Sequence, residues 1–96
     1  MTTEEILDIL TAFKQDFSAE YRLDRLGLFG SFARHEALAE SDVDIVFETR
    51  EPNLFRTARL REALESRVGR HVDIVRLRDN MNPSLRASIC RDGRFV

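Results

Sequence analysis

The sequence has few of the residues from which disulfide or zinc sites are built. Cys90 is its only cysteine, so the chain can form neither an internal disulfide nor a zinc site built on cysteines. Its two histidines, His35 and His71, lie far apart and match no zinc-ligand spacing, so neither is expected to bind a metal. Cys90 is expected to be a small buried residue on a helix.

The sequence also lacks long apolar runs, internal repeats, low-complexity segments and linkers. No apolar run approaches the length of a membrane span, and the acidic start Met1–Glu5 has no signal-peptide core. We therefore expect no membrane association and a cytoplasmic location. The length of 96 residues predicts one domain over 1–96, and 43% hydrophobic with 33% charged residues is an ordinary folded composition.

The net charge of −2 hides an asymmetry between the two parts of the chain. Residues 1–55 contain 12 acids against 5 bases, whereas residues 56–96 contain 5 acids against 10 bases, all of them arginine. Clustered arginine suits carboxylate or phosphate recognition, but local ion pairs on a solvated helix explain most of these residues better. Direct binding of nucleic acid is not expected.

Apolar periodicity predicts helices over 2–21, 31–37, 54–68 and from Asn82-Pro83 through Ile89. Short apolar or alternating runs predict strands over 26–29, 43–48 and 72–77. The resulting order α-β-α-β-α-β-α indicates an α/β or α+β domain with a small sheet flanked by helices.

The segment Asp42-Val43-Asp44 is the central chemical feature. Residues two apart on a strand point to the same face, so both carboxylates project together at the end of an apolar strand. Two like charges at the edge of a core are unfavourable unless a cation lies between them. Oxygen ligands favour Mg²⁺, so Asp42 and Asp44 are candidate metal ligands.

Asp73 supplies a third carboxylate in the same kind of setting, at the start of a later strand. If the two strands are neighbours in one sheet, the three acids can converge and hold two cations about 3.5–4 Å apart, as in-line phosphoryl chemistry requires. Asp73 is also a candidate for accepting the proton of an attacking hydroxyl group.

Gly30-Ser31 ends a strand and begins a helix, the position at which a backbone can approach phosphate. Arg34, one turn further on, is a candidate for the same phosphates. Each of these features is common alone. Their order and spacing, with a phosphate loop, an acid pair and a third acid each at a strand end, favour a nucleotide site.

These residues resemble the nucleotidyltransferase superfamily related to DNA polymerase β, and more closely the minimal nucleotidyltransferase (MNT) family. The family signature is Gly-Ser, ten residues, then Asp-x-Asp, as in Gly30-Ser31 and Asp42-Val43-Asp44. The segments 69–75 and 82–89 also look like the family pattern. Two departures are His35, where the family usually has Gly, and Arg91-Asp92-Gly93 in place of Arg-Glu-Ala.

The resemblance implies a mixed-sheet nucleotidyltransferase fold that transfers a nucleoside monophosphate from an NTP and releases pyrophosphate. Many MNT proteins are antitoxins of HEPN-domain RNase toxins, and some transfer AMP from ATP to a toxin tyrosine. Carried over, Asp42, Asp44 and Asp73 bind Mg²⁺ and catalyse transfer. Gly30, Ser31 and Arg34 bind the nucleotide.

Three hypotheses stay open from the sequence. The chain is an active antitoxin that adenylylates its toxin, a binding module that neutralises the toxin by occlusion through its arginines and Phe55, or an enzyme for a small molecule with a partner subunit. The acceptor, the base of the NTP and the oligomeric state, whether a hetero-oligomer or a homodimer, are left undetermined by the sequence.

Overall fold

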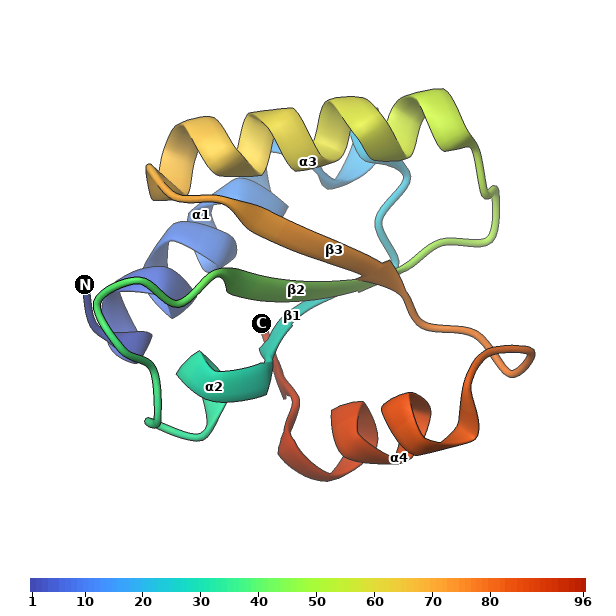
Figure 1. The fold of residues 1–96 in the computed structure, drawn as a ribbon. Coiled ribbons are helices and arrows are strands. Elements are labelled where there is room, and N and C mark those ends of the chain that lie inside the picture. The colour runs from blue at the N-terminus through green and yellow to red at the C-terminus, as the bar shows by residue number, and fades with distance from the viewer.

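Four helices pack around a four-stranded mixed sheet in the computed structural model, which describes residues 1–96 (Figure 1). The elements are α1 (Thr3–Tyr21), β1 (Arg25–Phe29), α2 (Gly30–Ala33), β2 (Val43–Glu48), α3 (Leu54–Val68), β3 (Val72–Arg76), α4 (Pro83–Asp92) and β4 (Arg94–Phe95).

The strands lie in the order β3-β2-β1-β4. β1 pairs antiparallel with both β2 and β4, whereas β2 and β3 run parallel. Parallel neighbours need a crossover, and α3 supplies it between β2 and β3. The predicted small mixed sheet flanked by helices is therefore confirmed.

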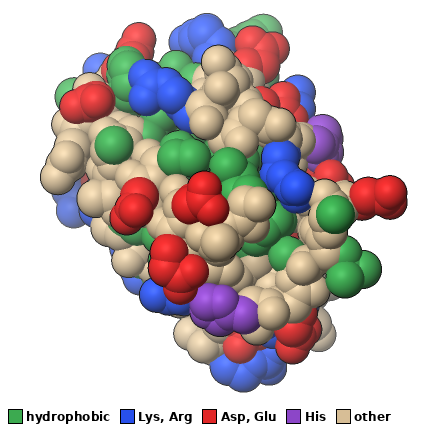
Figure 2. Space-filling model, turned by 90° about the vertical axis from the view of Figure 1, so that its left-hand side faces the viewer, with side chains coloured by type: hydrophobic (Ala, Val, Ile, Leu, Met, Phe, Trp, Pro, Cys, Tyr) green, Lys and Arg blue, Asp and Glu red, His purple; other side chains and the backbone are tan.

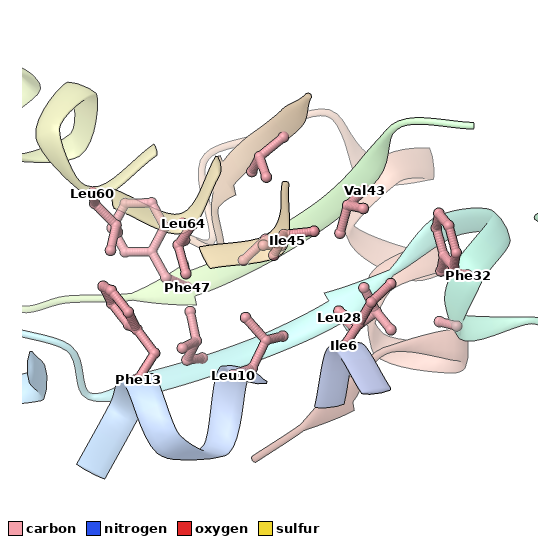
Figure 3. Packing of buried hydrophobic residues seen from close by; sticks show 14 of the residues in the cluster. Ile6, Leu10, Phe13, Leu28, Phe32, Val43, Ile45, Phe47, Leu60 and Leu64 are labelled. Carbon is pink, nitrogen blue, oxygen red and sulfur yellow. The ribbon is translucent and has the colours of Figure 1, made fainter. Parts of the chain in front are cut away.

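The two faces of β2 have different neighbours because successive side chains alternate. Val43, Ile45 and Phe47 point into the main core, against α1 and α3 (Figure 3). Val46 points to the other face, where it packs with Phe29 and with Ile89 of α4. Asp44 shares the face of Val46, so the fold directs it away from the main core. The other main-core residues labelled in Figure 3 are Ile6, Leu10, Phe13, Leu28, Phe32, Leu60 and Leu64.

The long helices begin and end where the sequence predicted. Thr2 forms a capping box with Glu5 at the start of α1, and the Asn53 side chain accepts a hydrogen bond from the Arg56 N–H at the start of α3. Gly69 ends α3 with a φ of 74°, a left-handed conformation that favours glycine.

Two local expectations were wrong, and one short strand was missed. The predicted helix 31–37 ends at Ala33, and His35 has a left-handed φ of 59°, which no helix can continue through. β4 was not predicted because a two-residue strand exists only through its pairing with Gly27 and Leu28. Cys90 is exposed rather than buried, because α4 turns Ile89 to the sheet and the next residue outward.

None of the helices combines the length and the apolar character needed to cross a bilayer.

Candidate metal and nucleotide site

The parallel strands β2 and β3 carry nearly the same five-residue sequence side by side. Residues 42–46 read Asp-Val-Asp-Ile-Val and residues 71–75 read His-Val-Asp-Ile-Val. The register pairs Asp44 with Asp73, and the residue before each strand, Asp42 or His71, continues the same alternation. Opposite residues of a parallel pair point to one face, so four ionisable groups gather at one end of the sheet.

The side chains meet at this end. The Nδ1 atom of His71 lies 3.4 Å from Oδ1 of Asp42 and 3.7 Å from Oδ1 of Asp73. The potential ligand atoms of these three residues all lie within 4.8 Å of one another. The structure thus brings Asp73 close to Asp42, whereas Asp44 is the register partner of Asp73 but does not belong to this three-residue group. The approach of His71 was not predicted.

The spacing of the two histidines matches no zinc motif and therefore gives no sign of this contact. The strand alternation held the missing signal, since His71 precedes Asp73 by two residues as Asp42 precedes Asp44.

Asp44 is the most buried of the three acids, and its environment disfavours the ionised form. Burial, followed by the neighbouring carboxylates of Asp73 and Asp42, raises the pKa of Asp44 above its usual value, and only Arg34 lowers it. A divalent cation bound between these carboxylates would reduce their mutual repulsion. The all-oxygen donors of Asp42, Asp44 and Asp73 fit a hard cation such as Mg²⁺.

Gly30 brings backbone directly against this acid. β1 ends at Phe29, which pairs with Asp44, and Gly30 follows with a left-handed φ of 72°. A Cβ at Gly30 would lie 2.9 Å from Cγ of Asp44 and closer still to its carboxylate oxygen, so both the conformation and the space require glycine.

Ser31 is half-buried in the first turn of α2, and no side chain caps this helix. The first N–H groups of α2 therefore have no capping partner, as expected for a segment that approaches phosphate.

Arg34 follows α2 and lies near enough to Asp44 to lower the pKa of its carboxyl group. Its guanidinium group pairs with Glu36 at 3.2 Å and lies 3.9 Å from Asp92 of α4. Arg34 thus stands near the acid cluster and shares its charge with two other acids, and its contact with phosphate stays a prediction.

Arg70 holds the loop that delivers Asp42, a role that the sequence analysis missed. Its guanidinium donates to the carbonyl oxygens of Ala39 and Ser41, at 2.7 and 3.0 Å. The guanidinium carbon lies 5.5 Å from the centre of the Phe32 ring. Because Ser41 directly precedes Asp42, these contacts fix one end of the acid cluster.

The acid cluster is open to solvent. The side chains of Asp42 and Asp73 are 51% and 52% exposed. None of the three main surface hollows is lined by a cluster acid, and the largest, about 470 Å³, lies between Ser18 and Glu51. Acidic side chains are spread over the face that Figure 2 shows. The cluster therefore offers exposed charge and cation ligands outside the three main hollows.

Comparisons with known proteins identify the family of this chain. The family model for the nucleotidyltransferase domain matches residues 7–96. The chain is 39% identical to the protein adenylyltransferase MntA of Thermococcus cleftensis, over 100% of this chain and 97% of that protein.

Solved structures share the fold. A candidate minimal nucleotidyltransferase superposes with a TM-score of 0.81 at 35% identity, over 98% of this chain and 95% of that one. A complex of tri-AMPylated Shewanella oneidensis HEPN toxin with MNT antitoxin gives a TM-score of 0.62 at 21% identity, over 97% and 66%. The chain therefore belongs to the nucleotidyltransferase domain family, within its minimal nucleotidyltransferase branch.

Proposed function

We propose that this nucleotidyltransferase is an antitoxin that transfers AMP from ATP to a tyrosine hydroxyl of a cognate HEPN RNase toxin, with Mg²⁺ as its cofactor. Three acids at one end of the sheet carry the proposal: Asp42 and Asp73 approach each other in the open, and Asp44, the register partner of Asp73, feels the charge of both. The proposal is supported by the adenylyltransferase name of the Thermococcus relative and by the AMPylated HEPN toxin in the Shewanella complex.

In this proposal the glycine turn binds the triphosphate and the acids bind the cation. The backbone at Gly30 and Ser31 approaches the triphosphate, and Arg34 offers its guanidinium to the same phosphates. Asp42, Asp44 and Asp73 hold Mg²⁺, which neutralises phosphate charge and polarises the reacting phosphoryl group when bound.

The transfer exchanges one oxygen bond of the α-phosphorus for another. The tyrosine oxygen forms a bond to the α-phosphorus of ATP, and the bond to the pyrophosphate oxygen breaks. The tyrosine proton passes to the carboxylate of Asp73, whose exposed side chain can be reached by a second molecule. The products are AMP-tyrosine in a phosphodiester linkage and pyrophosphate.

The openness of the cluster supports a protein acceptor. A small molecule needs walls that bury most of its surface, whereas a tyrosine on a folded partner arrives already positioned. Because the acids line none of the main hollows, positioning must come largely from the partner.

The proposal is tested with the purified chain, its candidate toxin, Mg²⁺ and ATP labelled on the α-phosphate. Label on a toxin tyrosine, lost when that tyrosine is replaced by phenylalanine, is the expected result. A labelled nucleotide that is never transferred, although the two proteins form a complex, would refute adenylylation.

A second candidate function is neutralisation by binding alone. Leu54 and Phe55 at the start of α3 are 88% and 79% exposed, an apolar pair with no cover in this chain. If occlusion is sufficient, the Asp42→Asn/Asp44→Asn variant still neutralises the toxin fully in a growth assay. If adenylylation is required, this double variant no longer neutralises the toxin. Phe55→Ser loses neutralisation only if Leu54 and Phe55 contact the toxin.

A further inference from the structure

We infer that His71 is a metal ligand, and that with Asp42 and Asp73 it forms a mixed nitrogen–oxygen position for a divalent transition-metal ion such as Zn²⁺ or Co²⁺. This inference rests on the cation-binding role of the acids in the proposed function. It adds a nitrogen donor that the acid triad lacks, and with it a preference among metals.

The distances carry the argument. Nδ1 of His71 lies 3.4 Å from Oδ1 of Asp42 and 3.7 Å from Oδ1 of Asp73, both longer than an ordinary N–H···O hydrogen bond. Two ligand atoms each about 2.1 Å from a tetrahedral zinc are roughly 3.4 Å apart. The separations thus match two ligands of one small ion better than they match a hydrogen bond.

The backbone holds these donors in place. The N–H of Val43 donates to the carbonyl oxygen of His71 at 3.0 Å, so the residues that precede β2 and β3 are tied together. Arg70 anchors the Ser41 carbonyl on one side of Asp42. The donors therefore come from two braced strand starts rather than from a mobile loop.

The cluster contains two kinds of donor set. Asp44 is the more buried acid, lies against Gly30 and stands outside the exposed group of Asp42, His71 and Asp73, so it marks an inner position. His71 belongs with Asp42 and Asp73 to an outer group whose three residues are all exposed. An imidazole nitrogen favours Zn²⁺ or Co²⁺ over Mg²⁺, which prefers oxygen ligands and retained water. The outer position should therefore select a different ion from the inner one.

The test measures metal binding without nucleotide or toxin, so it stays informative if adenylylation fails. Zn²⁺, Co²⁺ and Mg²⁺ are titrated by calorimetry into the wild type, His71→Asn and His35→Asn, which removes the only other histidine. Bound Co²⁺ is also followed by its visible absorption, which reports coordination geometry. Circular dichroism establishes that each variant is folded.

We expect His71→Asn to weaken Zn²⁺ and Co²⁺ binding at least about tenfold, the smallest effect of losing even an outer partner of a metal site, and to change the cobalt spectrum. Mg²⁺ binding and the His35→Asn variant should be unchanged. Equal Zn²⁺ affinity in His71→Asn and the wild type would overturn the inference. An equal loss for Zn²⁺ and Mg²⁺ would also overturn it, because His71 would then only be orienting the acids.

Discussion

The carboxyl group of Asp44 fills the space beside Gly30 that the Cβ of any other residue would enter. This contact joins the end of β1 to the start of β2, where Phe29 and Asp44 are register partners. The Gly-Ser turn and the Asp-x-Asp pair are therefore one packed unit, although ten residues separate them in the sequence.

Gly30→Ala should destabilise the protein more than Gly69→Ala does. Both glycines have nearly the same left-handed φ, 72° and 74°, but a Cβ at Gly69 meets nothing within 4 Å. Gly69→Ala should lower the free energy of unfolding by about 1–2 kcal/mol, because alanine is strained at this φ. Gly30→Ala should lower it further, because its Cβ also meets Asp44. Urea unfolding measures both values. Equal losses would show that Asp44 does not press on Gly30.

Asp44→Asn should raise the melting temperature of the metal-free protein at neutral pH. Since the folded pKa of Asp44 is raised, its stabilising contribution is present below the ordinary value of 3.8 and is lost as pH rises through the folded pKa. The difference between variant and wild type, followed by thermal unfolding in a chelator, should therefore shrink as pH falls toward 3.8.

Adding Mg²⁺ should reverse this order, because the wild type gains stability from a bound ion and the variant has lost a ligand. A variant that melts below the wild type in chelator at pH 7 would contradict the account of unrelieved charge at Asp44.

The long elements could be predicted because their signals are local. Asn53 and Gly69 mark both ends of α3, and alternation from Val43 marks β2, so both spans were predicted correctly. β4 and the end of α2 depend on pairing and on a left-handed residue that the sequence does not reveal. Alternation predicted that Asp42 and Asp44 share a face, but the approach of Asp73 and of His71 also needed the parallel pairing of β2 with β3.

His35→Gly should stabilise the protein. His35 has a φ of 59°, where glycine is free of strain, and this explains why a glycine is usual at this position in the family that the sequence resembles. The strain energy relieved in the folded state exceeds the entropic cost of ordering glycine. The free energy of unfolding should therefore rise by about 0.5 kcal/mol. Glu40→Gly, in the same loop but without a positive φ, should not gain, and a loss in His35→Gly would argue against strain at this turn.

Arg70→Ala should loosen the loop that leads to Asp42. The variant loses hydrogen bonds to the carbonyl oxygens of Ala39 and Ser41, at a stability loss of about 1–2 kcal/mol. Amide hydrogen exchange should increase over residues 38–43. Arg59→Ala removes an exposed arginine with no ion pair and should leave the exchange unchanged. Unchanged hydrogen exchange in Arg70→Ala would mean that the loop keeps its conformation without the Arg70 hydrogen bonds.

The most direct measurement of the central claim is transfer of AMP label to the candidate toxin by single variants of the three acids. Asp42→Asn, Asp44→Asn and Asp73→Asn should each lower the rate at least about 100-fold, because each removes a cation ligand or the proton acceptor. Asp79→Asn, at an exposed acid outside the cluster, should retain the wild-type rate. Wild-type transfer by Asp73→Asn would contradict the account, since convergence of the three acids would then have no role in the reaction.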